Sequence, residues 1–197
     1  MSRILLASRN AKKLAELRRI MAGADVEVVG LDDVPAYDEV PEDGATFADN
    51  ALLKAREAVR HTGIAAIADD SGICVDALNG MPGIFSARWC GRHGDDAANN
   101  ALLLAQLQDV PDERLTAHFT CAAAYVGTDG REVVAHGEMT GRLRREPSGS
   151  GGFGYDPLFQ PDGKSVTAAE LPPAEKDAIS HRGQAMRELA RRIAPYL

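Results

Sequence analysis

Residues 63–72 read GIAAIADDSG, a short apolar run followed directly by two carboxylates, a hydroxyl and a glycine. The apolar run predicts a buried strand that ends at Ala68. Adjacent acids rarely stand there for stability, but they can hold a divalent cation, accept a proton from water, or do both. We therefore expect Asp69 and Asp70 to belong to a functional site. The structural alternative is that Asp70 caps a turn through Ser71 while Asp69 faces solvent.

The patterns on either side of this run predict an alternation of strands and helices. Thr46, with Asp49 three residues later, fits a capping box, and the apolar positions that follow predict a helix ending at Gly63. The other predicted elements are strands over residues 3–8 and 26–29, a helix through Leu14, Leu17 and Met21, a helix capped by Asp95 or Asp96 and closed by Pro111, a hairpin of residues 115–126 and 132–143, and a closing helix through Met186, Leu189 and Ile193. Because helices alternate with strands early and a hairpin follows, we expect an α/β fold with a mixed sheet.

Length and composition are those of one folded domain. With 197 residues, 45% of them hydrophobic, the chain can bury a full core, so we expect a single domain over residues 1–197, with two closely joined lobes and no separable linker. Three widely spaced cysteines without a Cys-x-x-Cys pair indicate neither a disulfide framework nor a zinc site, and they favour a cytoplasmic location. The first apolar run is too short for a signal peptide, and no segment approaches the length of a membrane span.

The charge balance limits the class of partner. The chain has 22 Lys and Arg against 29 Asp and Glu, a formal charge of −7. Such a chain has no overall attraction to a polyanion, so nucleic acid is not an expected partner. Any phosphate must be held by locally concentrated positive groups, which favours a small anionic ligand.

A polar turn separates the first predicted strand from the first predicted helix. It consists of Ser8, Arg9, Asn10, Ala11, Lys12 and Lys13. Hydroxyl, amide, guanidinium and ammonium groups beside the amides of a helix N-terminus can bind phosphate. The turn lacks the glycines of a Walker loop or a dinucleotide fingerprint, so an ordinary solvated turn stays open as the alternative.

Residues 38–44, DEVPEDG, form an acidic loop before the second predicted helix. This loop could complete a cation site with Asp69 and Asp70. Magnesium is the expected cation, because a hard cation prefers carboxylates together with water and substrate phosphate oxygens. The alternative is an ordinary solvated surface, which is the usual role of a run of charges.

Two further segments carry groups that suit a planar, polar ligand. Residues 151–157, GGFGYDP, place aromatic rings in a glycine-rich loop, where they could stack on such a ligand; a buried aromatic corner is the alternative. Lys176, Ser180, His181 and Arg182 bring hydrogen-bond donors just ahead of the closing helix. Routine capping and surface charge are the alternative for that segment.

In this order, the four segments resemble those of the non-canonical purine nucleoside triphosphate pyrophosphatases, the inosine triphosphatase family. The resemblance covers nearly the whole chain. It implies a magnesium-dependent enzyme, usually a homodimer, that hydrolyses the purine nucleoside triphosphates ITP, dITP and XTP to the monophosphate and pyrophosphate. It also implies a mixed, elongated central sheet flanked by helices, with two lobes around a nucleotide-binding cleft.

The resemblance assigns a role to each matching residue. Asp70 matches the proton acceptor and a metal ligand, Glu42 falls where a metal-binding acid is expected, and Asp69 supports that site. Lys13 stabilises the leaving group. The substrate-binding positions are Ser8 to Lys13, Ser71, Phe153, Gly154, Tyr155, Asp156, Lys176, His181 and Arg182, with Phe153 stacking on the base. Two positions depart from the family pattern: Arg9 stands where glycine is frequent, and Tyr155 where some relatives have tryptophan.

Two rival functions share these residues. A nucleotide-sensing module would bind a purine triphosphate without cleaving it, and a pyrophosphatase for modified pyrimidines would also pair acids with magnesium. Pyrophosphate release distinguishes the first rival, and substrate preference distinguishes the second.

Overall fold

A computed structural model describes residues 2–23, 25–38 and 40–197. The strands are β1 (Ser2–Leu6), β2 (Val26–Val29), β3 (Ala65–Val75), β4 (Met81–Pro82), β5 (Thr116–Val126), β6 (Glu132–Leu143) and β7 (Phe159–Pro161). The α-helices are α1 (Ala11–Ile20), α2 (Phe47–Thr62), α3 (Asp96–Gln106), α4 (Pro173–Ile179) and α5 (His181–Ile193). Short 3-10 helices are η1 (Leu31–Asp33), η2 (Asp76–Leu78), η3 (Gly83–Arg88), η4 (Asp112–Arg114) and η5 (Ala194–Tyr196).

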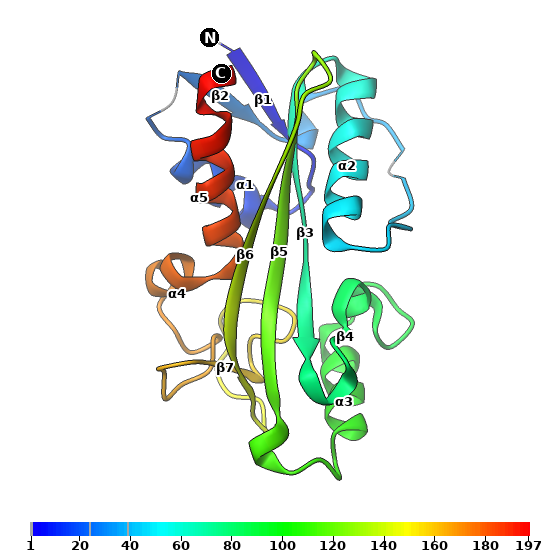
Figure 1. The fold of residues 1–197 in the computed structure, drawn as a ribbon, viewed down its shortest axis with the longest axis vertical. Helices are drawn as coiled ribbons and strands as arrows, with labels where there is room; N and C mark the ends of the chain where they lie inside the picture. Colours follow the sequence, from blue (N-terminus) through cyan, green and yellow to red (C-terminus); the bar gives the residue numbers. More distant parts are fainter. Residues whose placement is uncertain (1, 24, 39) are drawn as a thin grey trace. The chain divides into compact units, whose positions relative to one another are not determined.

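The strands form a mixed sheet whose hydrogen-bonded order is β2-β1-β3-β5-β6-β7, with β4 paired to β3 (Figure 1). β1 pairs in parallel with β2 and β3, whereas the β3–β4 and β6–β7 pairs are antiparallel. The predicted mixed α/β class is therefore confirmed. Among the described residues, no helix is both long enough and apolar enough to cross a membrane.

The chain divides into two compact units. The first comprises Met1–Asp70, Cys121–Gly137 and Arg182–Leu197, and the second comprises Ser71–Thr120 and Glu138–His181. Strands β3, β5 and β6 each contribute residues to both units. The boundary in β3 falls directly after Asp70, so the two acids belong to the first unit.

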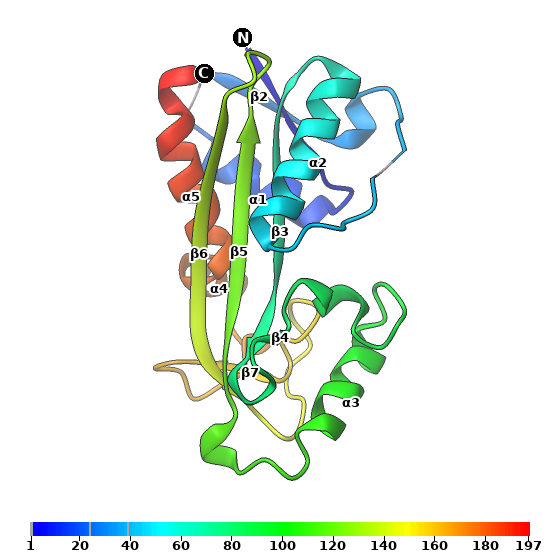
Figure 2. The ribbon, with the colours of Figure 1, turned by 45° about the vertical axis from the view of Figure 1, so that its right-hand side comes forward.

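Helices cover both faces of the sheet in the first unit, with α1 and α5 on one side and α2 on the other (Figures 1 and 2). One core cluster joins α1 and α5 to Ile67 of β3 and to Cys121 and Ala123 of β5. The intervening Ala122 packs with Ala51 of α2 instead. Successive strand residues point to opposite faces, so each position of β3 and β5 in this unit belongs to one helical layer or the other.

Helix α2 begins where the sequence predicts. Thr46 is its N-cap, with the Thr46 side chain accepting a hydrogen bond from the Asp49 N–H and the Asp49 carboxylate accepting one from the Thr46 N–H. At the other end, Gly63 adopts φ +66°, a left-handed conformation that glycine reaches without strain. The buried stripe of the helix is made of small residues, among them Ala51, Ala55 and Ala58, which lets α2 approach the sheet closely.

The second unit has its own core. Leu103 of α3 and Leu107, which directly follows that helix, pack there with Ile73 of β3 and Phe159 of β7. The predicted hairpin of β5 and β6 is confirmed to within a residue at each strand end. Its turn lies in the first unit and is closed by the Gly127 N–H donating to the Arg131 carbonyl at 2.8 Å.

Four predicted boundaries are wrong. The first strand ends at Leu6 and not at residue 8. Strand β3 does not end at Ala68 but continues to Val75, because Ile73 and Val75 are fully buried and extend the apolar pattern beyond the polar residues. The helix closed by Pro111 in the prediction ends earlier, at Gln106. His181 and Arg182 do not precede the closing helix; they form the start of α5.

Candidate functional site

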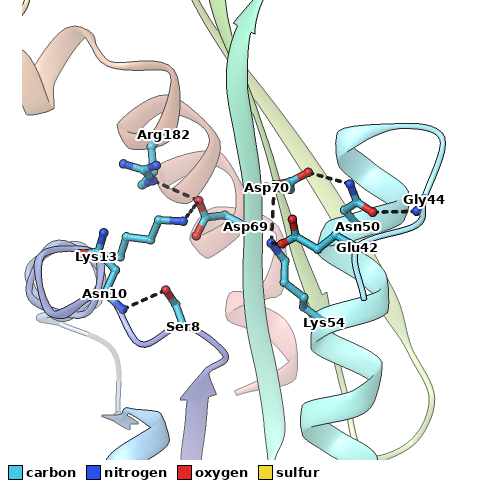
Figure 3. Close-up of polar contacts among 10 residues, drawn as sticks. All are labelled: Ser8, Asn10, Lys13, Glu42, Gly44, Asn50, Lys54, Asp69, Asp70 and Arg182. Atoms are coloured by element: carbon cyan, nitrogen blue, oxygen red, sulfur yellow. Dashed lines mark hydrogen bonds and ion pairs between the residues drawn. The ribbon is translucent and has the colours of Figure 1, made fainter. Parts of the chain in front are cut away.

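The two acids of β3 lie on opposite faces of the strand. Asp69 shares its face with Ile67 and points toward α1 and α5, whereas Asp70 shares its face with Ala66 and Ala68 and points toward α2 (Figure 3). Both side chains are buried in the protein. One strand therefore delivers two adjacent carboxylates into two separate polar environments.

Asp69 is held by two cations. Its Oδ2 atom accepts hydrogen bonds from Lys13 Nζ at 2.8 Å and from Arg182 Nε at 3.1 Å (Figure 3). Burial pushes the pKa of Asp69 upward, but the charges of Lys13 and Arg182 outweigh it and hold that pKa well below its usual value. Asp69 thus carries a permanent negative charge at neutral pH, and its other oxygen, Oδ1, has no hydrogen-bond partner among the described residues.

The predicted phosphate turn positions Lys13 for this contact. Asn10 stands directly before α1, and its Oδ1 accepts a hydrogen bond from the Lys13 backbone N–H at 3.3 Å, which is the geometry of an N-cap. Ser8 Oγ in turn accepts one from the Asn10 N–H at 3.2 Å (Figure 3). The first turn of α1 and its preceding residues are therefore ordered by short-range hydrogen bonds, with the Lys13 side chain directed at Asp69.

Other residues of the turn have different surroundings. Arg9 is exposed and lines a pocket of about 240 Å³ together with Leu31, Val34 and Tyr37. Ala11 is the first residue of α1. The side chain of Lys12 lies outside the described part of the structure. The turn thus brings Lys13 to Asp69 of β3.

Asp70 meets two residues of α2 instead. Its Oδ2 accepts a hydrogen bond from Asn50 Nδ2 at 3.0 Å, and its Oδ1 lies 3.6 Å from Lys54 Nζ. Lys54 also donates to Glu42 Oε1 at 2.6 Å, so one ammonium lies between two carboxylates (Figure 3). The structure therefore places Lys54 between Glu42 and Asp70, whereas Asp69, predicted to belong to the same cation site, pairs with Lys13 and Arg182.

The two acids have opposite electrostatic character. Burial raises the pKa of Asp70 above its usual value, and the negative charges of Glu42 and Asp69 add to that rise. Lys54 and the hydrogen bond from Asn50 only partly offset it. Asp70 is thus a better proton acceptor than an ordinary aspartate, while Asp69 is a poorer one.

The donor set around Asp70 fits a hard divalent cation. The described residues contain no group of three or more His, Cys, Asp and Glu side chains close enough to hold a metal ion by themselves. Asp70 and Glu42 nevertheless present two carboxylates to one positive charge, that of Lys54. Mg²⁺ is commonly bound by one or two carboxylates completed by water and phosphate oxygens, and these two residues meet that requirement.

In the second unit, Asp156 organises the glycine-aromatic loop. Its Oδ2 accepts a hydrogen bond from the Phe153 N–H at 2.8 Å and a further one from Lys176 Nζ. Gly152 has φ +72°, and a Cβ atom there would lie 2.1 Å from the same carboxylate oxygen, so only glycine fits. The Phe153 ring is 44% exposed and lies 5.5 Å from Lys176 Nζ, which leaves an aromatic surface available for stacking.

Helix α3 holds the next residue of this loop by both of its backbone groups. The Gly154 N–H donates to Asp96 Oδ2 at 2.7 Å, and the Gly154 carbonyl accepts from Asn100 Nδ2 at 2.9 Å. Tyr155 is buried in the core of the second unit, where its hydroxyl donates to the Ser86 carbonyl at 2.9 Å. Tyr155 therefore anchors the loop, and Phe153 is the ring that the loop presents.

His181 is buried in the second unit. Its imidazole stacks on Phe119, with ring centroids 4.8 Å apart and planes 9° from parallel. Ser71 is the first residue of the same unit and follows Asp70 in β3. The predicted base-recognition residues Lys176 and His181 thus belong to the second unit, whereas Arg182 belongs to the first and pairs with Asp69.

Sequence patterns missed two residues that contact Asp70. Asn50 and Lys54 are four positions apart on α2, and Asn50 is fully buried beside the alanine stripe of that helix. A buried polar residue among small apolar ones is the signal that could have identified Asn50, since such a group needs a hydrogen-bond partner. Asp96, Asn100 and Phe119 carry no comparable signal, because their contacts come from segments distant in sequence.

Comparisons with known proteins agree along the length of the chain. A model of the Ham1 family matches residues 4–192. The dITP/XTP pyrophosphatase of Nocardia farcinica is 66% identical over 197 residues, which cover 98% of this chain and 96% of that protein. The dITP/XTP pyrophosphatase of Mycobacteroides abscessus is 62% identical over 190 residues, covering 95% and 92%.

Solved structures give the same result. A nucleoside-triphosphatase / dITP/XTP pyrophosphatase from Mycobacterium abscessus has a TM-score of 0.81 at 63% identity and covers 95% of this chain and 98% of its own. A HAM1 protein from Coxiella burnetii has a TM-score of 0.90 at 40% identity, with coverage of 99% and 100%. The similarity thus includes the fold as well as the sequence.

Replacing Asp69 by Asn tests the buried ion pairs. The variant leaves Lys13 and Arg182 without their carboxylate, and we expect it to lower the free energy of unfolding by about 3 to 5 kcal/mol at pH 7. A carboxyl whose pKa is lowered in the folded state stabilises the protein above its unfolded pKa, and that stability is lost as the pH falls through the folded value. Urea unfolding from pH 7 to pH 2 should therefore show a smaller loss of stability in Asp69→Asn than in the wild type. Parallel curves would contradict the assignment.

Proposed function

Because the chain belongs to the Ham1 family, we propose that it is a dITP/XTP pyrophosphatase, which hydrolyses ITP, dITP and XTP to the nucleoside monophosphate and pyrophosphate. The observation that carries the proposal is the arrangement of the two acids on β3. One is held ionised between two cations, and the other is a proton acceptor beside a second carboxylate. This combination suits attack of water on a polyanionic phosphate chain.

Asp70 is the general base of the proposed reaction. It removes a proton from the water that attacks the α-phosphorus, while the bond from that phosphorus to the bridging oxygen breaks and pyrophosphate leaves. The raised pKa of Asp70 improves its capacity to take the proton. Burial also separates this carboxylate from bulk water, so the attacking water is the one that the site orders.

Lys13 and Arg182 supply positive charge for the phosphates. Both are fixed by Asp69, so their charged groups are held in place before the substrate binds. Preorganised charges of this kind stabilise a transition state without reorganising during the reaction, and loss of one typically costs about 2.7 to 4 kcal/mol in the barrier. The backbone amides at the start of α1 add a favourable dipole for phosphate.

Magnesium is part of the proposal, and Asp70 with Glu42 are the residues that would hold it. The ion would supply positive charge to the phosphate oxygens and the leaving pyrophosphate. Lys54 lies between the same two carboxylates, which supports a position for positive charge there. Glu42 and Asp70 together leave room in the donor set for phosphate oxygens and water.

The second unit carries the residues proposed to recognise the base. The exposed ring of Phe153 stacks on the purine, and Lys176 and His181 offer donors to the 6-keto oxygen. A 6-amino group would leave such donors unpaired, and each buried unpaired group costs roughly 1 to 3 kcal/mol. The site therefore favours deaminated purines over ATP. A homodimer and a cytoplasmic location complete the proposal, both from the family resemblance.

The decisive experiment is product analysis with ITP, XTP, GTP and ATP, each with magnesium and with EDTA. We expect IMP and pyrophosphate from ITP only when magnesium is present, with ATP largely spared. In water labelled with oxygen-18, the label should enter IMP, because the water attacks the α-phosphorus. IDP with inorganic phosphate would contradict the reaction, and ITP binding without turnover would instead support a sensing module.

Replacing Asp70 by Asn tests the general base. The amide cannot accept the proton, so kcat for ITP should fall by about 100-fold or more, consistent with the typical contribution of general-base catalysis. Asp109→Asn, which changes an exposed acid in the second unit, is the matched control and should keep wild-type kcat. Turnover by Asp70→Asn close to that of the control would remove Asp70 from this role.

Replacing Phe153 by Ala tests base stacking. Stacking of a base on an aromatic side chain contributes about 1 to 3 kcal/mol, so KM for ITP should rise by roughly 5-fold to 150-fold. Phe85 is a suitable control, because it is also a phenylalanine of the second unit and its exposed fraction, 40%, is close to the 44% of Phe153. Equal KM values for Phe153→Ala and Phe85→Ala would show that Phe153 does not contact the base.

A further inference from the structure

Two residues of α2 each connect Asp70 to the acidic loop that carries Glu42. Asn50 donates to Asp70 Oδ2 at 3.0 Å, and its own Oδ1 accepts from the Gly44 N–H at 2.9 Å. Lys54, one helical turn later, lies 3.6 Å from Asp70 Oδ1 and 2.6 Å from Glu42 Oε1. Each oxygen of the Asp70 carboxylate thus faces one of these two α2 residues (Figure 3).

The Lys54 and Asn50 contacts with Asp70 differ in how easily they can be displaced. The Lys54 side chain is 22% exposed, and its ammonium is a flexible point charge that a cation or a phosphate can draw away from the carboxylates. Asn50 is fully buried and neutral, and it is packed on the stripe of α2 that faces the sheet. When charge enters the site, Asn50 is therefore the contact that persists.

The orientation of the Asn50 amide follows from its neighbours. Gly44 presents a backbone N–H, which can only donate, so the Asn50 oxygen must face Gly44. The Asn50 NH₂ group then faces Asp70, whose carboxylate accepts. The side chain has one arrangement that satisfies both partners, and that arrangement fixes the distance between the loop and the base.

The absence of a side chain at Gly44 is needed for this contact. A Cβ atom at this position would lie 2.6 Å from Asn50 Oδ1, 2.7 Å from Asp49 Cβ and 3.0 Å from Asn50 N. No real Cβ atom tolerates the two shortest of these contacts, and the third is with backbone. The loop can approach α2 closely enough to donate to Asn50 only because residue 44 has no side chain.

We infer that Asn50 is a positioning residue, which holds the Asp70 carboxylate and the Glu42 loop in register for catalysis. The inference rests on the proposed function for its catalytic meaning. The contacts that carry this role are those of Asn50 with the Asp70 carboxylate and the Gly44 N–H. Asn50 fixes one oxygen of the Asp70 carboxylate, which leaves the other oxygen to face the site. Through Gly44, it also holds the loop that carries Glu42 against α2.

The test separates the two arms of Asn50. Asn50→Asp keeps an acceptor for the Gly44 N–H but loses the donor to Asp70, and Gly44→Ala keeps the donor to Asp70 but displaces the loop. Misplacement of a reacting group by about 1 Å can cost 100-fold, so we expect Asn50→Asp to lower kcat for ITP by about that factor with KM little changed. Gly44→Ala should lower kcat less and raise the magnesium concentration needed for half-maximal rate.

Thr46→Ala is the matched control. It removes the N-cap side chain of the same helix end but keeps the Thr46 carbonyl, which accepts from the Asn50 N–H, and both contacts of the Asn50 side chain. It should therefore lower the urea midpoint and leave kcat at the wild-type value. If Asn50→Asp also kept wild-type kcat, the inference would be wrong. A loss of kcat in Thr46→Ala equal to that in Asn50→Asp would also overturn it, because general loosening of α2 would then explain both.

A stability cycle tests the contact without using activity. The double variant Asn50→Asp/Asp70→Asn reverses donor and acceptor, so it should recover urea stability that Asn50→Asp loses while staying inactive. Additive effects of the two changes would show that the side chains are not coupled and would refute the inference. Failure of the wild type to release pyrophosphate would refute the proposed function instead, and this cycle would still be informative.

Discussion

The alternation of side chains along β3 is the constraint on which the site depends. Ile67 and Asp69 face α1 and α5, whereas Ala68 and Asp70 face α2. Since helices cover both faces of the sheet in the first unit, both acids are largely removed from water, and each finds its polar partners in its own layer. Two neighbouring carboxylates therefore acquire different partners and different acidities without any long-range device.

The same constraint explains the composition of α2. Its buried stripe is built from Ala51, Ala55 and Ala58, which bring the helix axis close to the sheet. Asn50 and Lys54 lie next to that stripe and reach Asp70 across the short gap. Larger apolar residues at the alanine positions would hold the helix away, and the buried carboxylate would lose both contacts. Small residues in the core are here a condition for the polar chemistry.

Local sequence patterns contained most of the secondary structure but little of the pairing within the site. The capping box of Thr46, the hairpin of β5 and β6 and the mixed sheet follow from periodicity and turn chemistry. The predicted end of β3 was wrong because Ser71 and Gly72 resemble a turn locally, whereas the burial of Ile73 and Val75 keeps the chain extended. Burial in a second core is a tertiary effect that a ten-residue window cannot contain.

The partners of the acids were beyond the sequence for a related reason. Lys13 and Arg182 are 169 positions apart, yet both donate to one oxygen of Asp69. Their meeting depends on α1 and α5 packing on the same face, and that packing is decided by the apolar cluster that joins them.

The charges of the described cluster bear on the role proposed for a cation. Lys13, Lys54 and Arg182 face Glu42, Asp69 and Asp70, so the positive charges are already matched by negative ones. A triphosphate entering such a balanced site meets no surplus of positive charge, and the formal charge of −7 on the whole chain adds repulsion. We propose that a divalent cation bound together with the phosphates would restore the balance next to Asp70 and Glu42. In the proposed reaction, magnesium would thus add positive charge that the already paired cations of the protein do not supply.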